Sequence, residues 1–267
     1  MAIFTTQLRG LRGLHHQPAD YYLLGSENFH LHLNPLIDKP ITFTNRHEIH
    51  CCHCGRKITK TFNNGYCYPC FQKLPQNDLC YVKPNLCHFA AGTCRDASFG
   101  ETYCNQPHAV YLAYSSNVKV GITPVNNTIQ RWMNQGAIQG MVLAVTPTRH
   151  IAGQLEAALT AHIADKTNWR KMLADLQPTA ELATTWDLMQ EKIPPEFTQY
   201  IIQRFPAVEI TYPVATYPPK IISLDLVKQP VISGILKGMK GQYLILDKGV
   251  INVKKYTGHL VEIHIED

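Results

Sequence analysis

The sequence predicts an α+β protein that contains a cysteine-rich, metal-binding region. Three observations support this fold class. Segments with the composition of β-strands lie near both ends of the chain, all nine cysteines fall between Cys51 and Cys104, and the segment after them combines strand and helix patterns. The predicted architecture is therefore a zinc-binding region and a small three-stranded α/β unit, flanked by N-terminal and C-terminal β segments.

Both ends of the chain have β character. Short segments near the N-terminus mix apolar and polar residues and are separated by turn residues, and residues 221–265 alternate apolar and polar residues between glycine turns. The C-terminal pattern predicts a β meander or barrel. We expect the two β ends to pair in one small barrel. The predicted N-terminal strands cover residues 2–11, 21–24, 29–33 and 41–45.

The first four cysteines form two Cys-x2-Cys pairs with twelve residues between them. Two such pairs can close a tetrahedral, structural zinc site, and bound thiolates imply a reducing compartment, so we expect a cytoplasmic protein. A register that uses Cys52 or His53 is a less regular alternative. The predicted ligands are Cys51, Cys54, Cys67 and Cys70.

The remaining cysteines have longer gaps and no paired spacing. The sequence between them is rich in Pro, Asn, Gly and Ser, so it buries little apolar surface and would gain most from a metal ion. We predict a second structural zinc site here. A site of three cysteines and one histidine, with His88 nearby, and free structural thiols remain alternatives. The predicted ligands are Cys80, Cys87, Cys94 and Cys104.

The third region combines strands and helices. Residues 110–114 and 118–122 predict a β-hairpin, residues 129–134 a short helix, residues 141–146 a third strand, and residues 151–164 an amphipathic helix. Further helices are predicted at 179–191 and 196–205. The chain thus divides into five segments: an N-terminal β segment at 1–50, the zinc-binding region at 51–107, the α/β core at 108–175, a helical and extended connection at 176–220, and the C-terminal β segment at 221–267.

Composition indicates a folded protein without a membrane-spanning segment. Of the 267 residues, 45% are hydrophobic and 17% are charged, as in folded domains. No stretch approaches about 20 consecutive apolar residues, and no signal-peptide pattern is visible. The net charge is +5 and the pI is about 8.7. We therefore expect no membrane association and a mild preference for polyanionic partners such as DNA or RNA.

Three residues of the α/β core fit the needs of phosphodiester cleavage. That reaction requires a carboxylate that holds a divalent cation, a cation that stabilises the phosphate, and a hydroxyl near the attacking water. Glu156, Arg131 and Tyr111 supply these groups on successive predicted elements. Each also has a structural alternative: a core aromatic for Tyr111, a surface cation for Arg131 and a solvated helix residue for Glu156.

Residues 108–170 resemble the GIY-YIG endonuclease superfamily. Ala109-Val110-Tyr111 stands where that family has Gly-Ile-Tyr, and Lys119-Val120-Gly121 stands where it has Tyr-Ile-Gly. The resemblance implies that Tyr111 activates water and that Glu156 holds Mg²⁺ or Mn²⁺. The chain departs from the pattern at Ala109 and at Lys119, where one hydroxyl is missing. The catalytic residues that the resemblance implies are Tyr111, Lys119, Gly121, Arg131 and Glu156.

Over nearly its whole length the chain is similar to a bacterial conserved-domain family of uncharacterised function. The likeness rests on motifs such as Gly65-Tyr-Cys-Tyr-Pro-Cys70, Gly92-Thr-Cys-Arg95 and Lys240-Gly-Gln-Tyr-Leu244. Asn77 departs from it, because the family tends to have cysteine there. The likeness implies an architecture and transfers no activity to this chain.

We therefore predict a nucleic-acid-processing protein, a divergent metal-dependent phosphodiesterase with structural zinc sites. Polar, aromatic and basic side chains predicted to contact the nucleic acid are Arg149, Asn168, Trp169 and Arg170. A plain helix start is the alternative for the last three, and an ion partner for the helix of Glu156 is the alternative for Arg149. At the level of function, the alternatives are a non-catalytic nucleic-acid-binding module and a protein-interaction adaptor.

Overall fold

The computed structural model describes residues 1–163, 167–177 and 181–266 and has a mixed α/β fold. The chain divides into two compact units, each of which contains segments that are far apart in the sequence. The units combine parts of several of the five segments named above. Unit 1 consists of Met1–Phe71, Leu173–Asp175 and Ile210–Asp267, and unit 2 consists of Gln72–Met172 and Leu176–Glu209.

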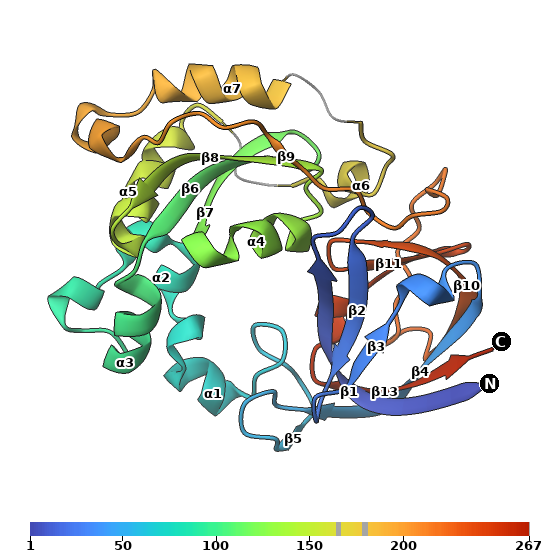
Figure 1. Cartoon of the computed structure of the whole chain (residues 1–267). Coiled ribbons are helices and arrows are strands. Elements are labelled where there is room, and N and C mark those ends of the chain that lie inside the picture. The colour runs from blue at the N-terminus through green and yellow to red at the C-terminus, as the bar shows by residue number, and fades with distance from the viewer. Residues whose placement is uncertain (164–166, 178–180, 267) are drawn as a thin grey trace. The chain divides into compact units, whose positions relative to one another are not determined.

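Unit 1 is built on one antiparallel sheet that joins the two ends of the chain. The C-terminal strand β13 lies between β1 and β4, and β10 pairs with the other edge of β4 (Figure 1). The β ends therefore pair in one sheet, as expected. Among the described residues the pairing runs β12-β11-β10-β4-β13-β1-β2-β3, with β5 on β4, and it does not close into a barrel. The strands are β1 (Ala2–Leu14), β2 (Asp20–Gly25), β3 (His30–His32), β4 (Pro40–His50), β5 (Lys57–Ile58), β10 (Val231–Lys240), β11 (Tyr243–Leu246), β12 (Gly249–Asn252) and β13 (His259–Ile265).

Alternation along the strands decides which face of this sheet is buried. In β13, Val261 and Ile263 are fully buried, whereas Glu262 between them is partly exposed. The amide of Gln242 then ties the turn between β10 and β11 to β1. Its Oε1 accepts from the N–H of Leu11 at 2.9 Å, and its Nε2 donates to the Leu11 carbonyl at 2.8 Å. The Gln242 side chain therefore satisfies the backbone N–H and carbonyl of Leu11, as a neighbouring strand would do.

Unit 2 contains the predicted hairpin and third strand. The central strand β6 pairs with β7 on one side and β8 on the other, and the short β9 adds a fourth strand beyond the three predicted. Helices α5 and α7 pack on the sheet and bury its apolar residues (Figure 1). The elements of this sheet and its helices are β6 (His108–Tyr114), β7 (Val118–Pro124), α4 (Thr128–Asn134), β8 (Gln139–Thr146), α5 (Arg149–Leu159), α6 (Trp169–Met172), α7 (Glu181–Gln190) and β9 (Val208–Glu209).

The helices differ from the sequence prediction at two places. Helix α5 begins earlier than predicted because Thr148 caps it by accepting from the N–H of Ile151, and it ends at Leu159. Helix α7 confirms the predicted helix at 179–191, whose first two residues lie outside the described ranges. The predicted helix at 196–205 is wrong beyond a short 3₁₀ helix, Pro195–Tyr200. Pro206 favours extended backbone in the residue before it, and Ile201 forms a β-bridge with Ala144 instead.

No helix in the described ranges is both long enough and apolar enough to cross a membrane.

A lysine is buried in unit 1. Lys240, at the end of β10, has no exposed surface, and its Nζ donates to the carbonyl of Ala174 at 3.3 Å. The same Nζ lies 5.5 Å and 5.3 Å from the ring centroids of Tyr212 and Tyr217. Burial lowers the pKa of Lys240 to about 8, and the charge of Asp175 opposes this effect. The charged form of Lys240 is therefore less stable in the folded state than in the unfolded state.

We expect Lys240→Met to stabilise unit 1 at pH 7 by about 1–3 kcal/mol, since a fall in pKa from 10.5 to about 8 corresponds to about 3 kcal/mol. The folded pKa is below the unfolded value, so wild-type stability should rise as the pH increases from 8 to 10.5. The advantage of the variant should shrink over the same range. Hydrogen exchange of the β10 and β11 amides at pH 7 and pH 9 measures both effects. A destabilised variant at pH 7 would contradict this interpretation.

Candidate functional site

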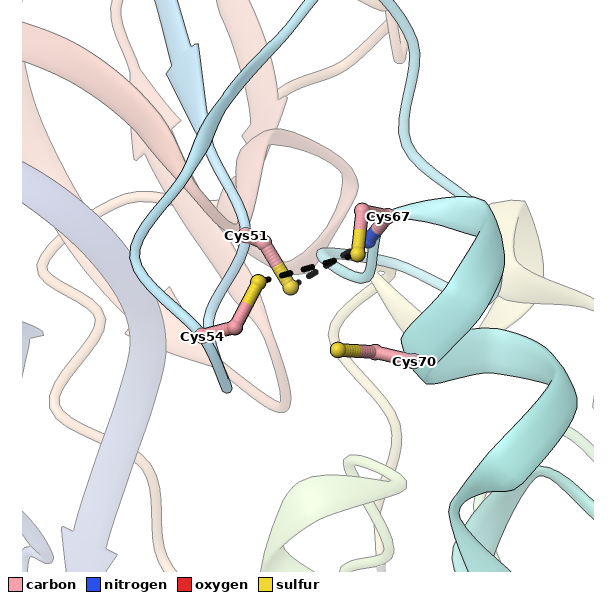
Figure 2. A group of neighbouring side chains, drawn as sticks. All are labelled: Cys51, Cys54, Cys67 and Cys70. Carbon is pink, nitrogen blue, oxygen red and sulfur yellow. Dashed lines mark hydrogen bonds between the residues drawn. The ribbon is translucent and has the colours of Figure 1, made fainter.

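The first cysteine group converges in unit 1 as predicted. Cys51 and Cys54 follow the end of β4, whereas Cys67 and Cys70 lie at the start of α1 (Tyr68–Lys73), and the four sulfurs face one another (Figure 2). All four lie within 4.8 Å of one another, and the sulfurs of Cys54 and Cys67 are 3.7 Å apart. A tetrahedral zinc ion with bonds of about 2.3 Å would place its sulfurs about 3.8 Å apart. The geometry therefore fits a metal ion of this size.

Charge in this cluster also fits a cation. Burial opposes ionisation of Cys51, but the N–H groups of Cys54, Cys67 and His53 outweigh it and lower the pKa of Cys51 to about 6. Burial and the neighbouring sulfurs raise the pKa of Cys70 to about 12. Each thiolate makes the next ionisation harder, so four thiolates are not stable together without a positive ion. A divalent metal would remove this conflict.

The local backbone explains why these cysteines meet. The N–H of Cys67 donates to the sulfur of Cys51 at 3.2 Å, and the N–H of Cys52 donates to the carbonyl of Gly65 at 2.7 Å. Gly65 has a φ of 122°, and a Cβ there would lie 2.6 Å from the sulfur of Cys52. Only glycine allows this approach of the two segments. Cys52 therefore packs against the turn at Gly65, whereas Cys51 and Cys54 belong to the cluster.

The second cysteine group surrounds a small cavity in unit 2. The cavity has a volume of about 10 Å³, which is room for about one water-sized sphere. Within it, ligand atoms of Asp78, Cys80 and His88 lie within 4.8 Å of one another. Burial raises the pKa of Cys80 to about 11 and that of Cys104 to about 12, so these thiols are neutral unless a metal displaces their protons. The four predicted ligands, Cys80, Cys87, Cys94 and Cys104, all line this cavity, but among the described residues their sulfurs do not form a group within 4.8 Å of one another.

Asp78 is a potential ligand that the sequence analysis missed. It caps α2 (Leu79–Val82) by accepting from the N–H of Cys80 at 3.1 Å. Its other oxygen accepts from Nε of Arg95 at 2.6 Å. The signal for this role was an aspartate two residues before a cysteine at a helix start. The ion pair with Arg95 offsets its charge, so Asp78 also has a structural use.

Tyr111 and Gly121 face each other across the hairpin. They are paired residues on β6 and β7, and a Cβ on Gly121 would lie 2.6 Å from the Tyr111 oxygen. Glycine at this place therefore makes room for the phenol. The Tyr111 ring is fully buried and packs edge-on against Trp132 of α4 at 5.8 Å. Its hydroxyl donates to Oε1 of Gln135 at 3.3 Å.

Arg131 and Glu156 join Tyr111 in one cluster. Arg131 hydrogen-bonds with the Tyr111 hydroxyl, and the charge of Glu156 acts on the same phenol. Arg131 has exposed surface as a residue, although protein surrounds most of its guanidinium, and Glu156 is partly buried. A phenol and a guanidinium from two elements therefore meet, and the carboxylate of a third element is near enough to act on the phenol through its charge. Gln135 was missed, although it lies four residues after Arg131 and so shares its side of the helix end.

The protonation of Tyr111 limits its chemistry. Burial raises its pKa, and Glu156 adds to this effect, whereas Arg131 and Gln135 act in the opposite direction. The phenol is therefore protonated at neutral pH. Around Arg131, partial loss of solvent opposes its charge, but the phenols of Tyr111, Tyr103 and Tyr81 favour it, and the net effect raises the pKa of Arg131.

Lys119 lies on the same face of the hairpin as Tyr111, and its side chain contacts Thr167. It is buried, and its Nζ donates to Oγ1 of Thr167 at 2.5 Å. Asn168 caps α6 by accepting from the N–H groups of Arg170 and Lys171. Arg170 is exposed and stacks on the partly buried Trp169, with its guanidinium carbon 4.3 Å from the ring centroid.

Arg149 does not have the surface position expected of a nucleic-acid contact. It is 3% exposed, and its guanidinium donates to the carbonyls of Cys80 at 2.7 Å and Tyr81 at 2.8 Å. These carbonyls lie in the last turn of α2, where a cation is favourable. The expectation for Arg149 is therefore corrected: the side chain links the C-terminal end of α2 to the N-terminal end of α5.

One face of α5 packs against the cysteine segment, residues 80–104, which carries the second cysteine group. Arg149, Gly153 and Glu156 are spaced at i, i+4 and i+7, so they lie on the same side of the helix. A Cβ on Gly153 would lie 2.3 Å from the carbonyl carbon of Pro84 and 2.4 Å from the nitrogen of Asn85. The backbone of the cysteine segment therefore rests directly on α5, on the side that carries Glu156.

Comparison with protein families matches residues 38–261 to DUF2797, which is described as a protein of unknown function. Because the match spans most of the chain, the chain belongs to this family. This confirms the uncharacterised conserved-domain family expected from the motifs. No curated protein and no solved structure matches the chain.

We expect Gly153→Ala to destabilise unit 2 by about 1–3 kcal/mol. Alanine is the better helix former by about 1 kcal/mol, but its Cβ would meet backbone atoms that cannot rotate away. All three tryptophans lie in unit 2, so urea unfolding followed by tryptophan fluorescence measures the effect.

Ala157→Gly is the matched control, because this exposed position on the same helix changes propensity alone. It should destabilise by about 1 kcal/mol. If Gly153→Ala instead stabilised the protein, the close packing of the cysteine segment on α5 would be wrong.

Proposed function

We propose that this protein is a divergent, metal-dependent phosphodiesterase of the GIY-YIG type that acts on nucleic acid. The observation that carries the proposal is the cluster of Tyr111, Arg131 and Glu156, contributed by β6, α4 and α5. The proposal is also supported by Gly121 of the Lys119-Val120-Gly121 motif, because glycine there leaves the space that the Tyr111 phenol needs. The net charge of +5 suits a polyanionic substrate.

Each residue of the cluster has a defined task in this proposal. Glu156 would hold one Mg²⁺ or Mn²⁺, which supplies Lewis-acid stabilisation of the phosphate when bound. The guanidinium of Arg131 binds the phosphate oxygens, and charge-assisted hydrogen bonds of this kind are strong in partly buried sites. Because Tyr111 stays protonated at neutral pH, it acts as a hydrogen-bond donor that orients the phosphate or the attacking water.

Two zinc ions would complete the fold. The first is held by Cys51, Cys54, Cys67 and Cys70, a set whose sulfur spacing fits tetrahedral zinc. The second is held in the cavity lined by Cys80, Cys87, Cys94 and Cys104. Four-thiolate sites are closed, so both ions have structural roles.

A specific observation also favours the non-catalytic alternative. Lys119 replaces a hydroxyl-bearing residue of the GIY-YIG pattern, and its Nζ is bound to Thr167. If the chemistry has lapsed, the protein would still bind nucleic acid without divalent cations, and the affinity would fall steeply with salt.

Zinc analysis of the purified protein tests the metal centres. We expect two zinc ions per wild-type chain and one after Cys51→Ser, because three thiolates hold zinc much less tightly than four. Cys94→Ser should remove the other ion.

Cys52→Ser is the control for Cys51→Ser, since Cys52 is adjacent in sequence and lies outside the cluster. It should retain both ions. A Cys51→Ser protein with its full zinc content would show that this group is not a metal site.

Cleavage assays test the phosphodiesterase. Wild-type protein should cleave labelled DNA or RNA when Mg²⁺ or Mn²⁺ is present. Glu156→Gln should lower the rate at least about 100-fold, because the amide binds a divalent cation weakly, and Arg131→Ala should have a comparable effect.

Glu191→Gln provides the control, because Glu191 is an exposed carboxylate of the same unit beyond the end of α7. Its activity should equal that of the wild type. Full cleavage by Glu156→Gln would exclude the proposed mechanism, and salt-sensitive binding without any turnover would establish the binding module instead.

A further inference from the structure

Three aromatic rings of the cysteine segment form a stack in unit 2. Tyr103 lies between Phe99 and Tyr81, with ring centroids 5.1 Å and 5.5 Å away and interplanar angles of 24° and 20°. Tyr103 is partly buried, whereas Tyr81 is 38% exposed. The stack thus has an inner part that protein surrounds and an outer ring that solvent reaches.

Arg149 fixes the outer ring in place. Its guanidinium carbon lies 5.4 Å from the ring centroid of Tyr81 and 5.7 Å from that of Tyr103, while its N–H groups hold the carbonyls of Cys80 and Tyr81. Both the backbone and the ring of Tyr81 are therefore constrained by the same buried cation. A ring that is already ordered loses little conformational entropy when a ligand stacks on it.

The stack lies beside the proposed phosphodiester site. The cysteine segment rests on the face of α5 that carries Glu156, through the contact between Gly153 and Pro84-Asn85. The phenol groups of Tyr81 and Tyr103 are also near enough to Arg131 to interact with it electrostatically. A cation and an exposed aromatic ring therefore occur together, and a nucleotide offers both a phosphate and a flat base.

We propose that Tyr81 is a stacking site for an unpaired base of a single-stranded nucleic acid, placed beside the phosphate that Arg131 binds. A base within a duplex presents its edges and not its flat faces, so this site selects single strands, loops or unstacked ends. The inference deepens the proposed function, because it names the form of the nucleic acid, and it rests on the phosphate role of Arg131. It also gives the second cysteine group a function: that group holds the segment that carries the ring.

Binding of an oligonucleotide without divalent cations tests the site separately from cleavage. The probe is a short single-stranded DNA with one 2-aminopurine, whose fluorescence falls when the base stacks on an aromatic ring. The full chain with its zinc should bind the probe and quench it. Tyr81→Leu should weaken the Kd by about 5- to 100-fold and remove the quenching, whereas Tyr81→Phe should keep both.

Tyr68→Leu is the matched control, since Tyr68 is 52% exposed and lies in unit 1. It should bind like the wild type. Zinc content and tryptophan fluorescence show whether each variant is folded. If Tyr81→Leu is not folded, a Tyr81→Trp variant tests the stacking site instead. Its larger ring should bind and quench the probe at least as well as tyrosine, and weaker binding and quenching would contradict the site.

The outcomes separate this inference from the proposed function. Glu156→Gln should keep the binding and quenching of the probe while it loses cleavage. Unchanged affinity of Tyr81→Leu, tighter binding of a duplex than of the single strand, or absence of quenching by the wild type would each overturn the stacking site. Cleavage that depends on Glu156 but not on Tyr81 would leave the phosphodiesterase intact and remove only the stacking site.

Discussion

The buried guanidinium of Arg149 is the contact on which the arrangement of unit 2 depends. Its charge lies where the last carbonyls of α2 would otherwise be left without partners, and it donates to those of Cys80 and Tyr81. Removing such a group from a buried network leaves unsatisfied acceptors and therefore costs more than the hydrogen bonds themselves. Because Arg149 is also the first residue of α5, the cysteine segment and the helix of Glu156 are positioned by one side chain.

The two cysteine groups solve different physical problems. In unit 1, Cys51 receives N–H groups from its own loop and from Cys67 of the second Cys-x2-Cys pair, and a sheet adjoins the cluster. In unit 2, the helices α2 and α3 (Ala97–Phe99) are one turn or less, so regular backbone hydrogen bonds hold little of the segment. Burial keeps the thiols of Cys80 and Cys104 neutral. A metal ion in this second group would contribute more to local folding than one in the first.

Local patterns in the sequence predicted most strands, the hairpin, α4, α7 and the convergence of the first four cysteines, because each depends on spacing within a short segment. The roles of Arg149 and Gly153 were not predictable in this way. Both contact residues between 80 and 85, about 70 positions earlier in the chain, and only tertiary structure brings those positions together. The helix at 196–205 failed for a related reason, since Ile201 pairs with a strand from elsewhere in the chain.

The position of Tyr111 restricts what kind of site this cluster can form. Gly121 leaves space for the phenol, Trp132 covers the ring, and the hydroxyl meets Arg131 and Gln135. A buried phenol with a raised pKa is a poor base, but it is a rigid donor, and rigid donors stabilise developing charge without reorganisation. Arg131 is the member of the cluster with the most exposed surface. In the proposed function, substrate recognition would fall to Arg131 and the ring of Tyr81, while the buried groups would fix the geometry that these two present.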